Sequence, residues 1–159
     1  MHITPDDLSG PEIRALLETH FAGMLANSPK DKCHFLDFDG LKGPDVTFWS
    51  VWTGDAPDAQ LMGCGALREM MGANGSKEGE IKSMRTDEGH LRKGAGAEML
   101  RHIIAEAQRR GYVRLNLETG SGAAFDAAHA LYLAHGFTYC GPFGDYREDP
   151  FSRFMTKPL

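Results

Sequence analysis

The sequence predicts an α/β fold in which one mixed β-sheet is flanked by helices. Strand-like and helix-like patterns alternate after Glu80, a glycine-rich turn joins one such strand to a helix, and no internal repeat interrupts this order. The order from Glu80 is strand, glycine loop, helix, strand, helix, strand, strand, so the sheet should contain parallel and antiparallel pairs. The 159 residues are 42% hydrophobic, which suits one core, and we expect a single domain over residues 1–159.

The N-terminal half predicts one amphipathic helix and a β-hairpin. Ser9 is the expected N-cap and Pro11 lies in the first helical turn, ahead of apolar residues at helical spacing, namely Ile13, Leu16, Leu17, Phe21, Met24 and Leu25. Residues 29–45 are expected to form a loop with at most a short helix. Residues 46–52 and 61–70 are rich in β-branched, aromatic and apolar residues, and we expect two hairpin strands there. Trp49 and Trp52, three positions apart, should face opposite sides of the sheet.

The C-terminal half contains the remaining elements. The helix that starts near Gly96 has a continuous apolar face and ends at Gly111. The other expected elements are strands at residues 80–86, 112–118 and 152–158 and a helix at residues 123–135.

Composition and charge exclude several classes of protein. The net charge of −5 and the absence of a lysine-arginine block disfavour a nucleic-acid-binding surface. No apolar run approaches the roughly 20 residues of a membrane span, and the first residues lack a secretory signal, so we expect a cytoplasmic protein without a membrane partner. Cys33, Cys64 and Cys140 are too widely spaced for paired zinc ligands or a disulfide framework, and we expect free thiols and no metal.

The segment "HLRKGAGAEML", His90 to Leu100, has the composition of an anion-binding turn. A glycine-rich turn before a helix directs several unpaired N–H groups, and the positive end of the helix dipole, toward one point. Gly94 and Gly96 lack the Cβ atoms that would hold a pyrophosphate away, and Arg92 and Lys93 add positive charge. The turn therefore predicts phosphate binding, although glycine at a helix start also occurs in simple tight turns.

Two common phosphate-binding motifs do not fit this segment. A P-loop requires Gly-Lys-Ser or Gly-Lys-Thr, which "GAGAEM" lacks. A Rossmann motif is imitated in part by Ala97 and Glu118, but that fold places the glycine loop after its first strand, and here the loop lies past the middle of the chain.

Two motifs together resemble the GNAT superfamily of acetyl-CoA-dependent N-acetyltransferases. Gly94 and Gly96 match the end of the family's Q/R-x-x-G-x-G/A signature, whose first position is occupied here by Leu91. "ALYLAHGF" matches A-x-x-L-Y-x-x-x-G-F at Ala128, Leu131, Tyr132, Gly136 and Phe137. The ending "YCGPFGDYREDPFSRFMTKPL", with the earlier "CHFLDFDGL", "VTFWSVW" and "GCGALREM", also resembles a YsnE-like bacterial branch of the family. The resemblance implies a sheet of about six to seven strands with about four helices, with splayed strands forming a wedge for coenzyme A.

The resemblance also implies where acetyl-CoA would bind. Main-chain groups around Met84, Arg85 and Thr86 would hold pantetheine and the acetyl oxygen. The pyrophosphate would be held by the glycine loop, through Leu91, Arg92, Lys93, Gly94, Ala95, Gly96 and Ala97. Leu91 departs from the Gln or Arg of the family at one of these contacts.

Catalysis in the family requires an acid and a base. Tyr132 matches the tyrosine that protonates the departing sulfur, and a phenol with a pKa near 10 is protonated at neutral pH. The alternative is that Tyr132 only packs in the core. Glu80 lies fourteen positions before Gly94, the spacing of the base in the histone-acetyltransferase branch. Glu118, which ends the neighbouring strand, is the rival and is otherwise expected to contact substrate.

The acceptor site is expected to use residues from both ends of the chain. By resemblance, His34 and Tyr146 would contact the acceptor, and Asp37 could also face it or cap a turn. Asp39 and Asp145 are better explained as turn residues. The acceptor is a primary amine of a small molecule or a peptide, attacking directly in a ternary complex. A non-catalytic module that binds CoA or a nucleotide is the alternative. Many relatives dimerise, so a homodimer stays open.

Overall fold

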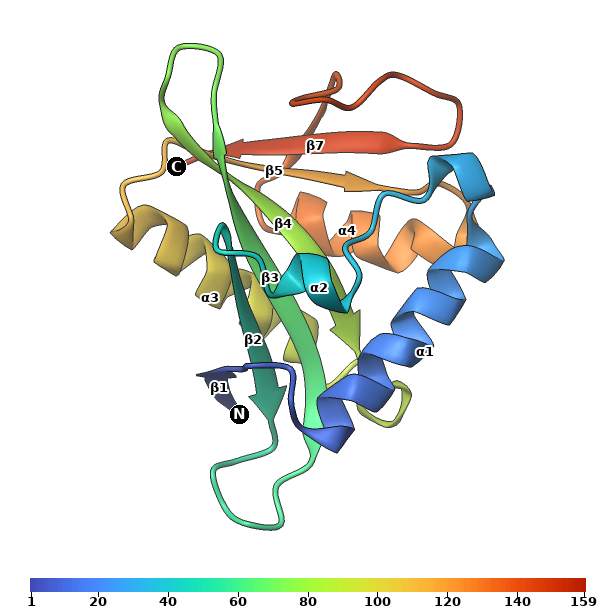
Figure 1. Ribbon diagram of the computed structural model, residues 1–159, viewed down its shortest axis with the longest axis vertical. Coiled ribbons are helices and arrows are strands. Elements are labelled where there is room, and N and C mark those ends of the chain that lie inside the picture. Colours follow the sequence, from blue (N-terminus) through green and yellow to red (C-terminus); the bar gives the residue numbers. More distant parts are fainter.

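The computed structural model describes residues 1–159 and contains one seven-stranded sheet in the order β1-β2-β3-β4-β5-β7-β6 (Figure 1). The strands are β1 (His2–Pro5), β2 (Val46–Trp52), β3 (Leu61–Met71), β4 (Lys77–Thr86), β5 (Arg114–Thr119), β6 (Thr138–Cys140) and β7 (Arg153–Pro158). β4 and β5 are parallel, and every other neighbouring pair is antiparallel. The expected mixture of pair types is therefore confirmed.

Helices cover both faces of the sheet (Figure 1). The helices α1 (Pro11–Asn27) and α2 (Phe38–Leu41) lie over one face, where Leu17, Leu41 and Ala66 belong to one apolar cluster. The helices α3 (Ala95–Arg109) and α4 (Asp126–Ala134) lie over the other face, where Leu100, Leu117 and Tyr132 belong to a second cluster. Short 3₁₀ helices occupy Lys30–Lys32, Glu88–His90 and Ala123–Phe125.

Two local expectations differ from the structure. β1 was not expected, because "HITP" is too short to show a strand period; it forms by pairing with β2 at the sheet edge. The expected N-cap at Ser9 is wrong: Gly10 precedes α1, and the Ser9 hydroxyl instead donates to Asp7 at 2.6 Å. Trp49 and Trp52 do face opposite sides, since they pack in different clusters.

Two irregularities in β4 shape the functional region. The register between β3 and β4 shifts between Cys64 and Ala66, and Ser83 opposite this bulge has a φ of +54°. On its other side, β4 pairs with β5 only at Gly79 with Leu115 and Glu80 with Asn116. The two strands diverge beyond these pairs, so residues 81–86 have no strand partner on the β5 side.

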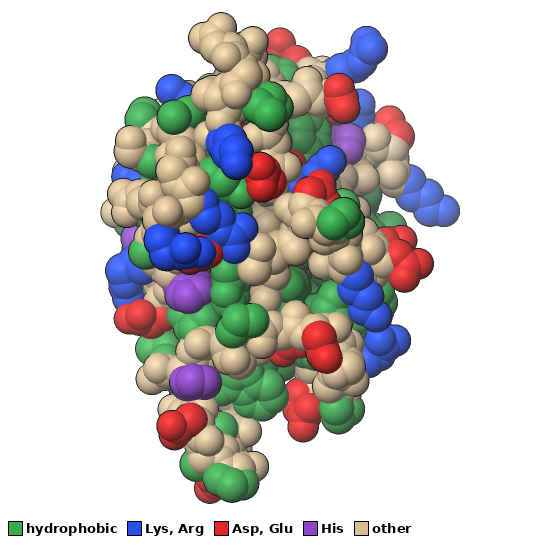
Figure 2. Space-filling model, turned by 60° about the vertical axis from the view of Figure 1, so that its left-hand side comes forward, with side chains coloured by type: hydrophobic (Ala, Val, Ile, Leu, Met, Phe, Trp, Pro, Cys, Tyr) green, Lys and Arg blue, Asp and Glu red, His purple; other side chains and the backbone are tan.

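None of the helices combines the length and the hydropathy that a membrane span requires. Basic and acidic side chains are intermixed on the face that Figure 2 shows, in keeping with the absence of a lysine-arginine block in the sequence.

Candidate active site

The glycine loop brings unpaired main-chain donors to the end of β4. Gly94 immediately precedes α3 and has a φ of +88°, a conformation that favours glycine. No side chain caps this helix, so the N–H groups of its first turn have no side-chain partner. Arg92 also has a positive φ, of +60°, and is exposed with Leu91 and Lys93. The donors and the helix dipole suit a phosphate group.

The helix α4 meets this loop and the end of β4 at one point. A Cβ atom placed on Gly96 would lie 3.4 Å from Leu131 Cδ2 and 3.5 Å from Thr86 Oγ1. A Cβ atom at Gly96 would therefore be in van der Waals contact with both neighbours. Since Leu131 is adjacent to Tyr132, the tyrosine is carried on the helix that borders this junction.

Tyr132 is almost fully buried and has a hydroxyl without a hydrogen bond to the protein. Its ring packs against Phe137 at a centroid distance of 5.7 Å. Burial raises the pKa of Tyr132 above its usual value, so the phenol is protonated at any physiological pH. The side chain thus holds a proton that no protein group accepts.

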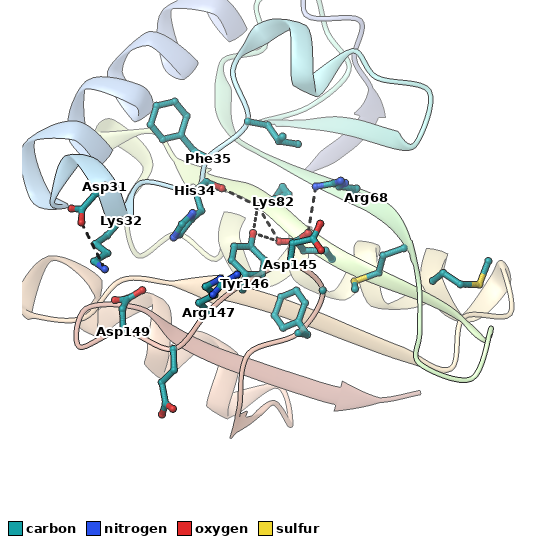
Figure 3. Close-up of a pocket in the computed structure, with 17 residues that line it drawn as sticks. Asp31, Lys32, His34, Phe35, Arg68, Lys82, Asp145, Tyr146, Arg147 and Asp149 are labelled. Atoms are coloured by element: carbon teal, nitrogen blue, oxygen red, sulfur yellow. Dashed lines mark hydrogen bonds and ion pairs between the residues drawn. The ribbon is translucent and has the colours of Figure 1, made fainter.

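On the α1 face of the sheet, Glu80 and Lys82 form a buried ion pair. Their side chains are 2.9 Å apart, and both residues are less than a tenth exposed. Lys82 Nζ also donates to the Tyr146 hydroxyl at 2.6 Å and to the His34 carbonyl at 2.9 Å (Figure 3). Tyr146 in turn donates to Glu80 Oε1 at 2.5 Å. All three donors of the lysine are therefore satisfied.

Glu118 lies on the same face of the sheet as this ion pair. Leu117 faces α3 and α4, so its neighbour Glu118 faces the other side of the sheet. Asn116, two positions before Glu118 and on the same face, is the register partner of Glu80. Glu118 forms no salt bridge, and its position beyond the last β4–β5 pair places it beside the diverging strands. Burial raises the pKa of Glu118 to about 7. The Ser152 side chain and the charge of Lys82 oppose this rise, and the neighbouring Glu80 and Asp149 carboxylates add to it.

A cavity of about 750 Å³ opens above the ion pair. One wall comes from residues 31–36, another from residues 143–149, and the strand side from Arg68, Glu80 and Lys82, as Figure 3 shows. The lining includes His34 and Tyr146, so the structure brings these two predicted residues together with Glu80. Asp145 also lines the cavity, whereas Asp37 accepts a hydrogen bond from Gly40 at 2.9 Å and caps α2.

Lys82 and Arg68 were not predicted from the sequence. Arg68 lies 3.1 Å from Asp45 and 3.9 Å from Glu80, so it joins the ion-pair network. Lys82 could have been found, because it is two positions from Glu80 in a strand and therefore shares its face. No local pattern points to Arg68, whose place beside Glu80 depends on the register of β3 against β4.

Comparisons with known proteins agree on one family. The profile of the Acetyltransferase (GNAT) family matches residues 12–137. The chain is 52% identical, over the full length of both proteins, to YsnE of Bacillus subtilis strain 168, described as an uncharacterized N-acetyltransferase. It is 50% identical to YedL of Escherichia coli K12, described in the same words, over 99% of this chain and 94% of YedL.

A solved structure shares the fold over nearly its whole length. It is described as a putative acyl-CoA N-acyltransferase from Klebsiella pneumoniae, is 28% identical, and superimposes with a TM-score of 0.73 over 99% of this chain and 97% of that one.

Proposed function

The chain belongs to the GNAT acetyltransferase family, and on that premise we propose that it transfers an acetyl group from acetyl-CoA to a primary amine by direct attack in a ternary complex. The observation that carries this proposal is the divergence of β4 from β5 beyond Glu80 and Asn116, beside the helix start at Gly94. Acetyl-CoA supplies an activated acyl group as a thioester. The non-catalytic alternative assigns no role to the phenol of Tyr132, whose hydroxyl bonds to no other residue, or to the carboxylate of Glu118 beside the diverging strands.

The binding residues follow from the main chain. We infer that the first-turn amides of α3, from Ala95 to Ala97, hold the pyrophosphate, because no side chain caps this helix. The preceding turn is formed by Leu91, Arg92, Lys93 and Gly94. Main-chain groups of Met84, Arg85 and Thr86 have no strand partner on the β5 side, and they can bond to an extended pantetheine as a strand would.

Tyr132 acts as the general acid. Burial keeps its phenol protonated, and its hydroxyl has no partner within the protein that would retain the proton. It donates that proton to the sulfur as the bond between sulfur and the acetyl carbon breaks.

A carboxylate must take a proton from the acceptor, because an ammonium group has no lone pair for attack. Glu80 was expected in this role, and both Lys82 and Tyr146 bond to its Oε1 atom. Glu118 has no such partner and a pKa near 7, which suits a base at neutral pH. We assign the role of the general base to Glu118. Glu80 would instead position the residues around it, through its bonds to Lys82 and Tyr146.

The burial and the location of two cysteines favour direct attack over transfer through an acetylated cysteine. Cys64 is 1% exposed, its thiol donates to the Ser83 carbonyl at 3.3 Å, and burial raises its pKa to about 12. A thiol of this kind is a poor nucleophile. Cys140 lies on β6, away from the diverging strands.

The proposal is tested with acetyl-CoA and a panel of primary amines. We expect calorimetry to show acetyl-CoA binding, and we expect amine-dependent release of free thiol together with a product heavier by one acetyl group. Failure to bind acetyl-CoA would contradict the proposal. Accumulation of an acetylated cysteine in the absence of amine would contradict direct attack.

A further inference from the structure

Two loops from opposite ends of the chain meet above β4. The first joins α1 to α2 and carries His34, and the second joins β6 to β7 and carries Tyr146. The two rings touch edge to face, with centroids 5.3 Å apart and an interplanar angle of 84°. Figure 3 shows both side chains directed toward each other across the cavity. Two walls of the cavity are thus joined by a contact between these rings, which we call the His34–Tyr146 bridge.

Lys82 fastens the bridge from below. Its ammonium group bonds to the main-chain oxygen of His34 on one loop and to the hydroxyl of Tyr146 on the other. Lys82 is 8% exposed and its partner Glu80 is 4% exposed. Moving either loop away would cost the buried ammonium group one of its three hydrogen bonds, and leaving a buried donor unpaired is costly. Both loops are therefore held to β4 by the same ammonium group.

Along β4, the bridge is fastened between the part of the cavity lined by residues of β3 and the strand end where the acyl group is expected. Lining residues Arg68, Met70 and Met71 pair with the first half of β4, whereas the acyl group is expected near Met84 in its second half. The bridge is fastened at Lys82, between these two regions. An extended peptide advances about 3.3 Å per residue and needs an open groove on both sides of the reacting amine. A molecule held within the cavity needs no such groove.

The size and charge of the cavity fit a compact polar ligand. Its volume of about 750 Å³ lies within the range of small-molecule sites. The lining has acidic Asp31, Glu80, Asp145, Glu148 and Asp149 and basic Lys32, Arg68, Lys82 and Arg147. The excess of one carboxylate favours a cation, and the exposed Arg147, which forms no salt bridge, can meet an anionic or polar group of the same ligand.

Resting on the proposed function, we propose that the acceptor is a small, polar, free amine, and that the His34–Tyr146 bridge excludes the amines of polypeptides. The bridge is accordingly a specificity determinant, and the two loops discriminate by size before any acetyl transfer occurs.

Matched acceptors test the inference. Each of several amino acid amides is compared with a hexapeptide that begins with the same residue, and a hexapeptide with an internal lysine is compared with a short alkylamine. We expect kcat/KM to be at least about tenfold higher for the small member of each pair, which corresponds to about 1.4 kcal/mol. Equal or faster acetylation of the hexapeptides would overturn the inference and leave the proposed function intact.

Substitution of the bridge gives a second readout. His34→Ala removes the ring but keeps the main-chain oxygen that binds Lys82, so the loop stays fastened while the bridge opens. We expect the ratio of peptide to small-amine kcat/KM to rise. Phe35→Ala is the matched control, because Phe35 lines the same cavity but stacks on Phe21. A ratio that is unchanged in His34→Ala, or that rises equally in Phe35→Ala, would count against the bridge.

A binding measurement separates the two proposals. CoA is linked through an acetyl spacer to a small amine or to a hexapeptide, and the dissociation constants are compared with that of CoA alone. We expect the peptide conjugate to bind no more tightly than CoA. Tighter binding of the peptide conjugate would refute the exclusion of polypeptides. Absence of turnover with every amine would refute the enzymatic proposal and with it the acceptor, whereas weaker binding of the peptide conjugate than of the small-amine conjugate would still support exclusion by the bridge.

Discussion

Lys82 Nζ lies 2.6 Å from the hydroxyl oxygen of Tyr146, 64 positions later in the chain, and the same ammonium group lies 2.9 Å from Glu80. The pair thereby ties the last loop of the protein to the strand expected to hold the acyl donor. The first three predictions below concern this network or the carboxylate beside it.

Replacing Lys82 by Met should be strongly destabilising, because Glu80 would remain buried without its main partner. We expect a loss of about 3–5 kcal/mol in the free energy of unfolding, measured by urea denaturation at pH 7. The double variant K82M/E80L removes both charges and should recover much of that loss. A single variant as stable as the wild type would show that Arg68 alone neutralises Glu80.

Glu118→Gln should remove the ionisation that controls acetyl transfer near neutrality. The wild-type kcat/KM should rise with pH through about 7, because the proposed base works only when deprotonated. The variant should lose about 10²-fold or more in kcat/KM. It should also lose the rise of kcat/KM with pH, which is the ascending limb of the pH profile. Glu80→Gln should reduce activity but keep the limb, since Glu80 is a positioning residue. If instead Glu80→Gln lost this rise with pH and Glu118→Gln kept it, Glu80 would be the base.

The same carboxylate should lower the stability of the protein at alkaline pH. The folded-state pKa of Glu118 is raised from 4.5 to about 7, so its contribution to stability is fully present below pH 4.5 and is lost as pH rises through 7. At pH 8 the cost is at most on the order of 3 kcal/mol, and solvent screening reduces it. Glu118→Gln should therefore unfold at a higher temperature than the wild type at pH 8, with a smaller difference at pH 5. Calorimetric scans at the two values would check this.

Tyr132→Phe should slow turnover without weakening acetyl-CoA binding. The variant keeps the ring that packs on Phe137 and loses only the proton donor, so we expect kcat to fall by about 10²-fold while calorimetry gives an unchanged dissociation constant. Tyr139→Phe is the control, since Tyr139 is 52% exposed on β6 and bonds to His129. An equal kcat for Tyr132→Phe and the wild type would leave this tyrosine a packing role alone.

Gly94→Ala should weaken the grip on the pyrophosphate. An alanine at a φ of +88° costs about 1–2 kcal/mol in stability and tends to turn the first amides of α3 away from the ligand. We expect the dissociation constant for CoA to rise about tenfold, the equivalent of one lost main-chain bond. Gly75→Ala, in the turn between β3 and β4, has a similar φ of +74° and open space around its Cβ position. It should lose comparable stability and no affinity.

The parts of the site that sequence could predict are those whose geometry is local. The apolar face of α3 follows from the 3.6-residue period, and the turn before it follows from glycines, one of which has a positive φ. The motif around Tyr132 is contiguous. In the structure, the turn lies between β4 and α3, and Tyr132 lies on α4.

The parts that could not be predicted depend on contacts between distant segments. Lys82 bonds to residues 48 and 64 positions away, and nothing in the neighbourhood of either loop indicates that they meet. β1 is four residues long and depends on β2 for its pairing. Lys82 forms its salt bridge with Glu80 and not with Glu118, and a strand pattern cannot show which carboxylate the lysine reaches.

The sheet is continuous across its middle through only two register pairs, Gly79 with Leu115 and Glu80 with Asn116. An extended molecule lying between the diverging ends would supply inter-strand bonds that the polypeptide itself does not make. Coenzyme A would then act as an added strand, and its hydrogen bonds would hold the β1–β4 half of the sheet more firmly to the β5–β7 half. Amide hydrogen exchange should slow on β4 and β5 together when it binds, and the protein should be mechanically most compliant along this seam between rounds of turnover.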